Sequence, residues 1–155
     1  MPSSVSSRRI LHNYPRAREV RVFLRKVRRL KPVLIILFGS VARGNFKEDS
    51  DADVLILFER PLRWAQVYSL GMGVVQPVVK TMDEFSALLE EGEPFAFEIL
   101  EDGVLLYDAD GYHARFTKQA AAARDRHCLV RVKGSWRWTV GQVQSWPCQL
   151  YAPDP

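Results

Sequence analysis

An unbroken apolar segment, residues 33–38, constrains the fold of this chain more than any other feature. Its side chains are mostly branched and none is polar, which is typical of a strand buried on both faces of a sheet. Gly39 ends the segment abruptly. A second apolar run of the same kind occupies residues 54–58, after a polar stretch. The two runs therefore predict two buried strands, joined by a polar connection that starts at a glycine.

Amphipathic and short apolar patterns on either side of these runs predict the remaining elements. In residues 15–31 apolar side chains recur at helical spacing, Pro15 suits a first helical turn, and Pro32 ends the helix. We expect further helices over residues 61–70, 82–91, 94–102 and 111–126, a helical turn over 40–43, strands over 74–79 and 104–107, and extended structure over 130–138. Pro77 indicates a sheet edge or a bulge. A sheet core with helices is an α/β (α+β) architecture.

The chain has 155 residues, which is enough for one domain with its own core. We expect a flexible N-terminal arm over residues 1–14, a folded domain over residues 15–138, and a C-terminal tail over residues 139–155 that has no periodic signal. The first residues contain no apolar h-region, and no apolar run approaches the ~20 residues that span a bilayer. We therefore expect a cytoplasmic protein without a membrane segment.

Basic residues gather in the N-terminal part of the chain. Residues 1–31 contain ten lysines and arginines but only one acid, Glu19. Such a block is typical of a surface that meets nucleic acid or a phosphate-rich ligand. The simpler explanation, which follows from the general behaviour of charge runs, is a solvated cationic helix face. Nucleic-acid binding through this helix is therefore an open alternative.

The residues that follow the first strand carry the chemical signal. Gly39 and Ser40 begin a helical turn, where backbone N–H groups and the serine hydroxyl can hold phosphate oxygens. Arg43 lies one turn further on and can reach the same anion. Asp51 and Asp53 enter the second strand on one side of it, since residues i and i+2 of an extended chain share a face. Two carboxylates beside a phosphate site are typical of Mg²⁺ ligands.

Each part of this pattern also has a simpler interpretation. Gly39 and Ser40 can form an ordinary turn and helix cap. Asp51 and Asp53 can belong to an acidic turn together with Asp49. However, two carboxylates at a strand entry repel one another unless a cation compensates their charge. This repulsion favours the metal site.

The complete string, Gly39-Ser40, ten residues, Asp51-x-Asp53, resembles the signature of the DNA polymerase beta nucleotidyltransferase superfamily. More narrowly, it is similar to the minimal nucleotidyltransferases (MNT), small prokaryotic proteins that are often paired with HEPN-domain proteins. The string Gly-Ser-x-Ala-Arg-Gly that ends at Gly44, and Ser50 before the first aspartate, also fit. The resemblance covers roughly residues 17–138, and its first part is the most specific.

The resemblance implies a mixed-sheet nucleotidyltransferase fold with flanking helices, and transfer of a nucleoside monophosphate from ATP or another nucleoside triphosphate to a protein or small-molecule hydroxyl. It also implies two Mg²⁺ ions. Gly39 and Ser40 would bind the triphosphate, and Asp51 and Asp53 would be the metal ligands and catalytic residues. The acceptor in a HEPN/MNT pair can be a tyrosine of the HEPN toxin, so this chain would be the antitoxin.

The resemblance further implies a third carboxylate on a neighbouring strand, which helps to deprotonate the acceptor. The matching position here is Gln76, whose amide can hold an acceptor by hydrogen bonds but cannot take its proton. Glu98, in an expected helix, is a poor replacement. Two alternatives therefore stay open. One is a catalytically weak or inactive nucleotide-binding module that neutralises a partner by contact, and the other is a nucleic-acid-binding protein.

A minimal domain lacks the extra subdomain with which larger transferases hold an acceptor. An apolar or aromatic patch is the usual contact that supplies such selection. We therefore expect a HEPN-type protein partner, or a homo-oligomer, to bind around Trp136 and Trp138.

Overall fold

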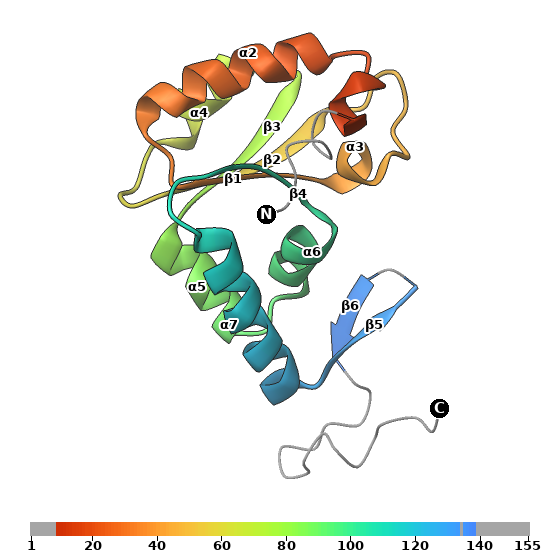
Figure 1. The fold of residues 1–155 in the computed structure, drawn as a ribbon, viewed down its shortest axis with the longest axis vertical. Helices are drawn as coiled ribbons and strands as arrows, with labels where there is room; N and C mark the ends of the chain where they lie inside the picture. Colours follow the sequence, from red (N-terminus) through yellow and green to blue (C-terminus); the bar gives the residue numbers. More distant parts are fainter. Residues whose placement is uncertain (1–8, 134, 139–155) are drawn as a thin grey trace.

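The computed structural model describes residues 9–133 and 135–138, and its centre is a four-stranded sheet (Figure 1). The strands are β1 (Leu34–Phe38), β2 (Ala52–Phe58), β3 (Val75–Thr81) and β4 (Val104–Asp108), in the order β3-β2-β1-β4. β1 runs antiparallel to β2 and to β4, whereas β2 and β3 are parallel. The mixed sheet implied by the family resemblance is therefore confirmed.

The central strands bury both faces, which explains their continuous apolar sequence. Along β1, Ile35 and Leu37 point into one core layer, and Leu34 and Ile36 point into the other; all four are fully buried. β3 lies at the sheet edge and contains Pro77, as the sequence predicted. An edge strand tolerates proline because its outer side needs no ladder hydrogen bond.

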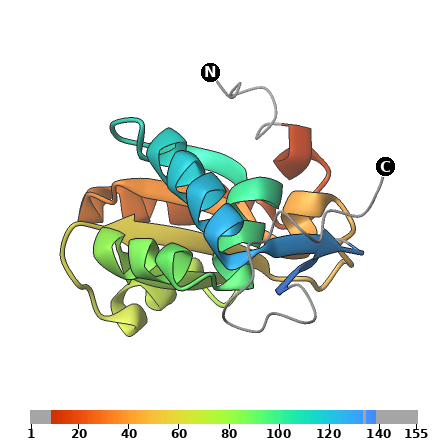
Figure 2. The same ribbon diagram turned by 90° about the horizontal axis from the view of Figure 1, so that it is seen from below.

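Helices cover both faces of the sheet (Figures 1 and 2). One face carries α2 (Ala17–Val27), its 3-10 extension η1 (Arg28–Leu30), α4 (Trp64–Tyr68) and η2 (Ser69–Gly71), and the other carries α5 (Met82–Glu90), α6 (Pro94–Asp102) and α7 (Tyr112–His127). In α2 the residues Val20, Phe23 and Val27 are fully buried, as the helical spacing predicted. The arginines between them face outward.

The sequence placed most helix ends within two residues of their observed positions. The helix over residues 94–102 has the predicted bounds, and the one over 82–91 ends one residue earlier, at Glu90. The prediction over 61–70 is partly wrong, because only Trp64–Tyr68 is α-helical and a 3-10 turn follows. A flexible arm was expected over residues 1–14, but Leu11 and Tyr14 are buried in the core. These two residues therefore belong to the folded domain.

Two antiparallel strands, β5 (Leu129–Val132) and β6 (Ser135–Trp138), form a second sheet separate from the main one. Arg131 connects β5 to the end of α6 through ion pairs with Glu101 and Asp102. The C-terminal tail over residues 139–155 lies outside the described residues, as do the side chains of Trp136 and Trp138.

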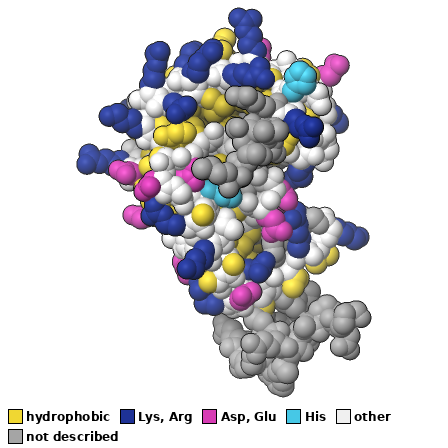
Figure 3. Space-filling model, in the orientation of Figure 1, with side chains coloured by type: hydrophobic (Ala, Val, Ile, Leu, Met, Phe, Trp, Pro, Cys, Tyr) yellow, Lys and Arg dark blue, Asp and Glu magenta, His cyan; other side chains and the backbone are white. Residues whose placement is uncertain are grey.

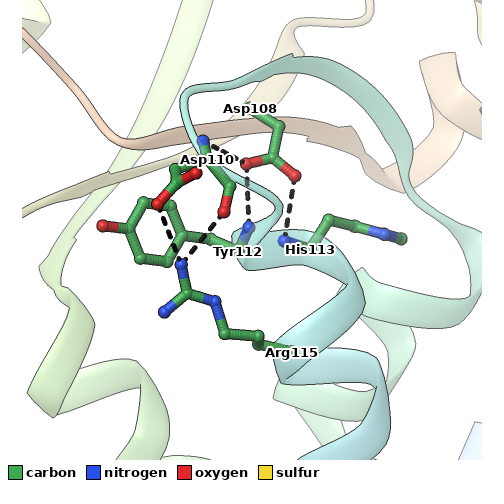
Figure 4. Close-up of polar contacts among 5 residues, drawn as sticks. All are labelled: Asp108, Asp110, Tyr112, His113 and Arg115. Atoms are coloured by element: carbon green, nitrogen blue, oxygen red, sulfur yellow. Dashed lines mark hydrogen bonds and ion pairs between the residues drawn. The ribbon is translucent and has the colours of Figure 1, made fainter.

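Asp108, at the end of β4, fixes the start of α7 (Figure 4). Its Oδ1 accepts hydrogen bonds from the backbone N–H of Asp110 at 3.2 Å and of Tyr112 at 2.9 Å. Its Oδ2 accepts one from the backbone N–H of His113 at 3.1 Å. Arg115 closes the turn from the helix side by donating to Asp110. One carboxylate therefore satisfies N–H groups that the first helical turn leaves unpaired.

Among the helices of the described segments, none combines the length and apolar character that a membrane span requires.

Candidate active site

Gly39 brings the turn after β1 into direct contact with β2. The glycine begins α3 (Gly39–Arg43) and has φ +74°, a conformation that L residues rarely adopt. A Cβ atom at this position would lie 2.5 Å from Oδ2 of Asp53, closer than van der Waals contact allows. Only glycine fits both the backbone conformation and this approach. The turn expected to hold phosphate therefore lies against one of the two predicted metal ligands.

Strand pairing brings the predicted site residues together from three separate segments. Asp53 pairs with Phe38 of β1 on one side and with Gln76 of β3 on the other. Paired residues of neighbouring strands share a face of the sheet. Asp51 lies just before β2, and its Oδ2 accepts a hydrogen bond from Nε2 of Gln76 at 3.5 Å. Gln76, which occupies the position where the family resemblance implies a third carboxylate, therefore lies beside both aspartates.

The electrostatics of Asp53 reflect its surroundings. Partial burial raises the pKa of its carboxyl, the neighbouring charge of Asp51 raises it further, and Arg43 lowers it. Desolvation and like charge both disfavour the ionised form. A cation next to the two carboxylates would reverse this effect. Arg43 is exposed at the end of α3, and its charge reaches Asp53.

Two residues beside the site were missed in the sequence analysis. Arg16, just before α2, donates from Nη1 to Oδ1 of Asp51 at 3.4 Å. The Tyr14 hydroxyl donates to the backbone carbonyl of Ser50, and its ring contacts Phe46 edge-to-face at 5.3 Å. Burial is the main reason why the pKa of Tyr14 is raised. No local pattern reveals these contacts, because Tyr14 falls in a polar segment and Arg16 in a run of arginines.

The donor set fits a hard divalent cation. Asp51 and Asp53 offer carboxylate oxygens on one face, and the amide of Gln76 contains a carbonyl oxygen that could turn toward the same point. Residues 9–133 contain no group of three or more His, Cys, Asp and Glu side chains placed to hold a metal. The site thus has two carboxylates. Glu98 lies on α6, as expected, and no described contact joins it to Asp51 or Asp53.

Comparisons with known proteins find similarity to nucleotidyltransferases. The family "Polymerase beta, Nucleotidyltransferase" matches residues 23–112, a segment that contains Gly39, Asp51, Asp53 and Gln76. "Putative protein adenylyltransferase MJ0141" of Methanocaldococcus jannaschii is 32% identical over 75 residues, which cover 42% of this chain and 76% of that protein. "Putative protein adenylyltransferase MJ0604" of the same organism is 36% identical over 78 residues, covering 47% of this chain and 76% of that protein.

A solved structure described as a putative nucleotidyltransferase from Sulfolobus solfataricus shares 22% identity, with a TM-score of 0.44 over 70% of this chain and 88% of that chain.

The family match covers more than half of the present chain, and it includes both the glycine turn and the paired aspartates. The chain therefore belongs to the polymerase beta nucleotidyltransferase family, and it is a nucleotidyltransferase.

Proposed function

We propose that this protein is a Mg²⁺-dependent nucleotidyltransferase that moves a nucleoside monophosphate, most simply AMP from ATP, to a hydroxyl group of a protein. The observation that carries the proposal is the close approach of Gly39 to Asp53, because it brings the turn proposed to bind phosphate against one of the two proposed metal ligands. The names of the two Methanocaldococcus relatives support a protein acceptor. A small-molecule hydroxyl is the alternative acceptor.

The residues around this contact would bind different parts of the substrate complex. Gly39 and Ser40 present the start of α3 to the triphosphate, and Arg43 adds a positive charge at the end of the same turn. Asp51 and Asp53 would hold one or two Mg²⁺ ions. When bound, the metal neutralises phosphate charge and orients the triphosphate for in-line attack. These residues lie where β1 ends and β2 begins, since Phe38 pairs with Asp53.

Transfer forms a bond between the acceptor oxygen and the α-phosphorus, while the bond from that phosphorus to the bridging oxygen breaks and pyrophosphate leaves. The acceptor hydroxyl must lose its proton during the attack. Gln76 lies beside Asp53, and its amide oxygen can accept a hydrogen bond from a hydroxyl but cannot remove its proton. We therefore expect slow transfer, unless a group of the acceptor protein supplies the missing base.

The glutamine also supports a second candidate function. A chain that binds Mg²⁺ and nucleotide through Asp51 and Asp53 but lacks a base could neutralise a partner by contact alone. A HEPN-type toxin would fit both functions, as a tyrosine acceptor in the first and as a bound partner in the second. The contact expected around Trp136 and Trp138 involves side chains outside the described ones, and it stays a prediction.

A third candidate, nucleic-acid binding, rests on the outer face of α2. Arg18, Arg21 and Arg25 are exposed there, opposite the buried stripe of the helix. Figure 3 shows Lys and Arg side chains gathered over the region where Figure 1 places α2. This candidate would be favoured by an affinity for nucleic acid that decreases steeply as the salt concentration rises and does not change when nucleotide is added.

Calorimetry with ATP, in the presence and absence of Mg²⁺, tests the site. We expect Mg²⁺-dependent binding by the wild type and its loss in the double variant Asp51→Asn, Asp53→Asn. Asp49→Asn is the matched control, because Asp49 is an exposed acid of the same loop. A double variant that binds Mg·ATP as tightly as the wild type would place the site elsewhere. Transfer of radiolabel from the α-phosphate of ATP to a co-purified partner then separates catalysis from binding.

A further inference from the structure

The contact between Arg16 and Asp51 joins the start of α2 to the candidate metal site. Nη1 of Arg16 lies 3.4 Å from Oδ1 of Asp51, although the two residues are 35 positions apart in the chain. The other carboxylate oxygen, Oδ2, accepts from Nε2 of Gln76 at 3.5 Å. Both oxygens of Asp51 are therefore engaged by groups of the protein itself.

The position of Arg16 is fixed by its neighbours. Tyr14, two residues before it, is 2% exposed, and its hydroxyl donates to the carbonyl of Ser50, the residue before Asp51. Ala17, directly after it, is buried in the core. The backbone on both sides of Arg16 is thus held by packing, and the guanidinium stays within reach of Asp51.

The ion pair is open to exchange with solvent ions. The side chains of Arg16 and Asp51 are 35% and 40% exposed. Arg43 acts on the other aspartate, because its charge lowers the pKa of Asp53. Arg16 therefore supplies the direct positive partner of Asp51, at a place where two carboxylates would otherwise repel one another.

We infer that Arg16 is the internal counter-charge of Asp51, so that a divalent cation must displace its guanidinium to bind there. This inference rests on the proposed function, because it takes Asp51 as a metal ligand. A guanidinium and a divalent cation on one carboxylate repel each other, and the pairing with Arg16 reduces the negative charge that attracts the ion. Arg16 thus lowers the affinity of the site for metal alone, and it keeps the adjacent carboxylates compatible with the fold when no divalent cation is bound.

Binding of Mn²⁺ alone, followed by electron paramagnetic resonance, tests the inference without any measurement of transfer. Arg16→Gln should bind Mn²⁺ about two- to fivefold more tightly than the wild type, as expected for a partly exposed ion pair. The melting temperature of Arg16→Gln should be lower than that of the wild type without divalent cations, and should rise more on addition of MgCl₂. The matched control is Arg18→Gln, which removes the same charge from the exposed face of α2.

The outcomes separate this inference from the proposed function. Tighter Mn²⁺ binding by Arg16→Gln than by Arg18→Gln supports the competition. Unchanged or weaker binding by Arg16→Gln, with normal binding by the wild type, overturns it and leaves the metal site intact. Absence of Mn²⁺ and Mg·ATP binding by the wild type overturns both the proposed function and the inference.

Discussion

Gly39 and Asp53 approach each other so closely that the space for a side chain at position 39 is occupied by the Asp53 carboxylate. The distance from a Cβ at this position to Oδ2 would be 2.5 Å. The turn proposed to bind phosphate and one of the proposed metal ligands are thereby fixed to one another by backbone geometry, since β1 and β2 pair at Phe38 and Asp53.

Gly39→Ala should abolish Mg²⁺-dependent ATP binding, because the new methyl group would push Asp53 away from the turn. Gly44→Ala is the matched control: its φ is +76°, but a Cβ there meets nothing within 4 Å. We expect Gly44→Ala to lose roughly 1–2 kcal/mol of stability from the left-handed backbone alone, with ATP affinity unchanged. Calorimetry and chemical unfolding measure the two effects. Equal ATP affinity in both variants would show that the close approach is unimportant for binding.

The stability that Asp53 contributes to the protein without divalent cations should fall as the pH rises through the titration of this carboxyl. The folded state raises the pKa of this carboxyl above its usual value of 3.8. The folded protein therefore keeps the proton to higher pH than the unfolded chain does, and this contribution to stability is present below pH 3.8 and lost as the pH passes the folded pKa. Asp53→Asn should remove this pH dependence. The free energy of unfolding of the variant should therefore rise relative to that of the wild type as the pH increases. Urea unfolding of both proteins between pH 3.5 and pH 7 measures this difference. Addition of Mg²⁺ should stabilise the wild type more than the variant.

Gln76→Asp should raise the rate of nucleotidyl transfer, by up to ~10²-fold, because a positioned base assists the attack of the acceptor hydroxyl. The affinity for nucleotide should stay the same, since Gly39 and Ser40 lie on a different element. Single-turnover transfer of radiolabelled AMP measures the change. Robust wild-type transfer that Gln76→Ala leaves untouched would mean that another residue is the base. Tight nucleotide binding without transfer, in both the wild type and Gln76→Asp, would favour the contact-only function.

Asp108→Ala should destabilise the fold by about 1–2 kcal/mol, because the first-turn N–H groups of α7 would lose their carboxylate partner. Three backbone N–H groups, those of Asp110, Tyr112 and His113, depend on it (Figure 4). Asp110→Ala is the control, since this exposed acid pairs with the exposed Arg115 and should cost far less. Thermal unfolding compares them, and a similar loss in both variants would contradict the assignment.

Local sequence determined most of the elements of this protein, because their signals lie within each segment. The apolar run before Gly39 becomes the central strand β1, and Pro94 and Gly103 bound α6 as the sequence indicated. The spacing between Gly39-Ser40 and Asp51-x-Asp53 also identified the candidate site, since a strand, a turn and a second antiparallel strand bring Gly39 and Asp53 together over a short stretch of chain.

Tertiary structure decided which distant groups join that site. The parallel pairing of β3 with β2 places Gln76 beside Asp53, and strand order is not contained in the periodicity of either strand. Arg16 looks like one of several solvent-facing arginines in the sequence, yet it alone among the described basic residues forms an ion pair with Asp51. Its position follows from the burial of Tyr14 and Ala17, which depends on the whole core. Side-chain partners across 35 positions are set by packing, and no local pattern encodes them.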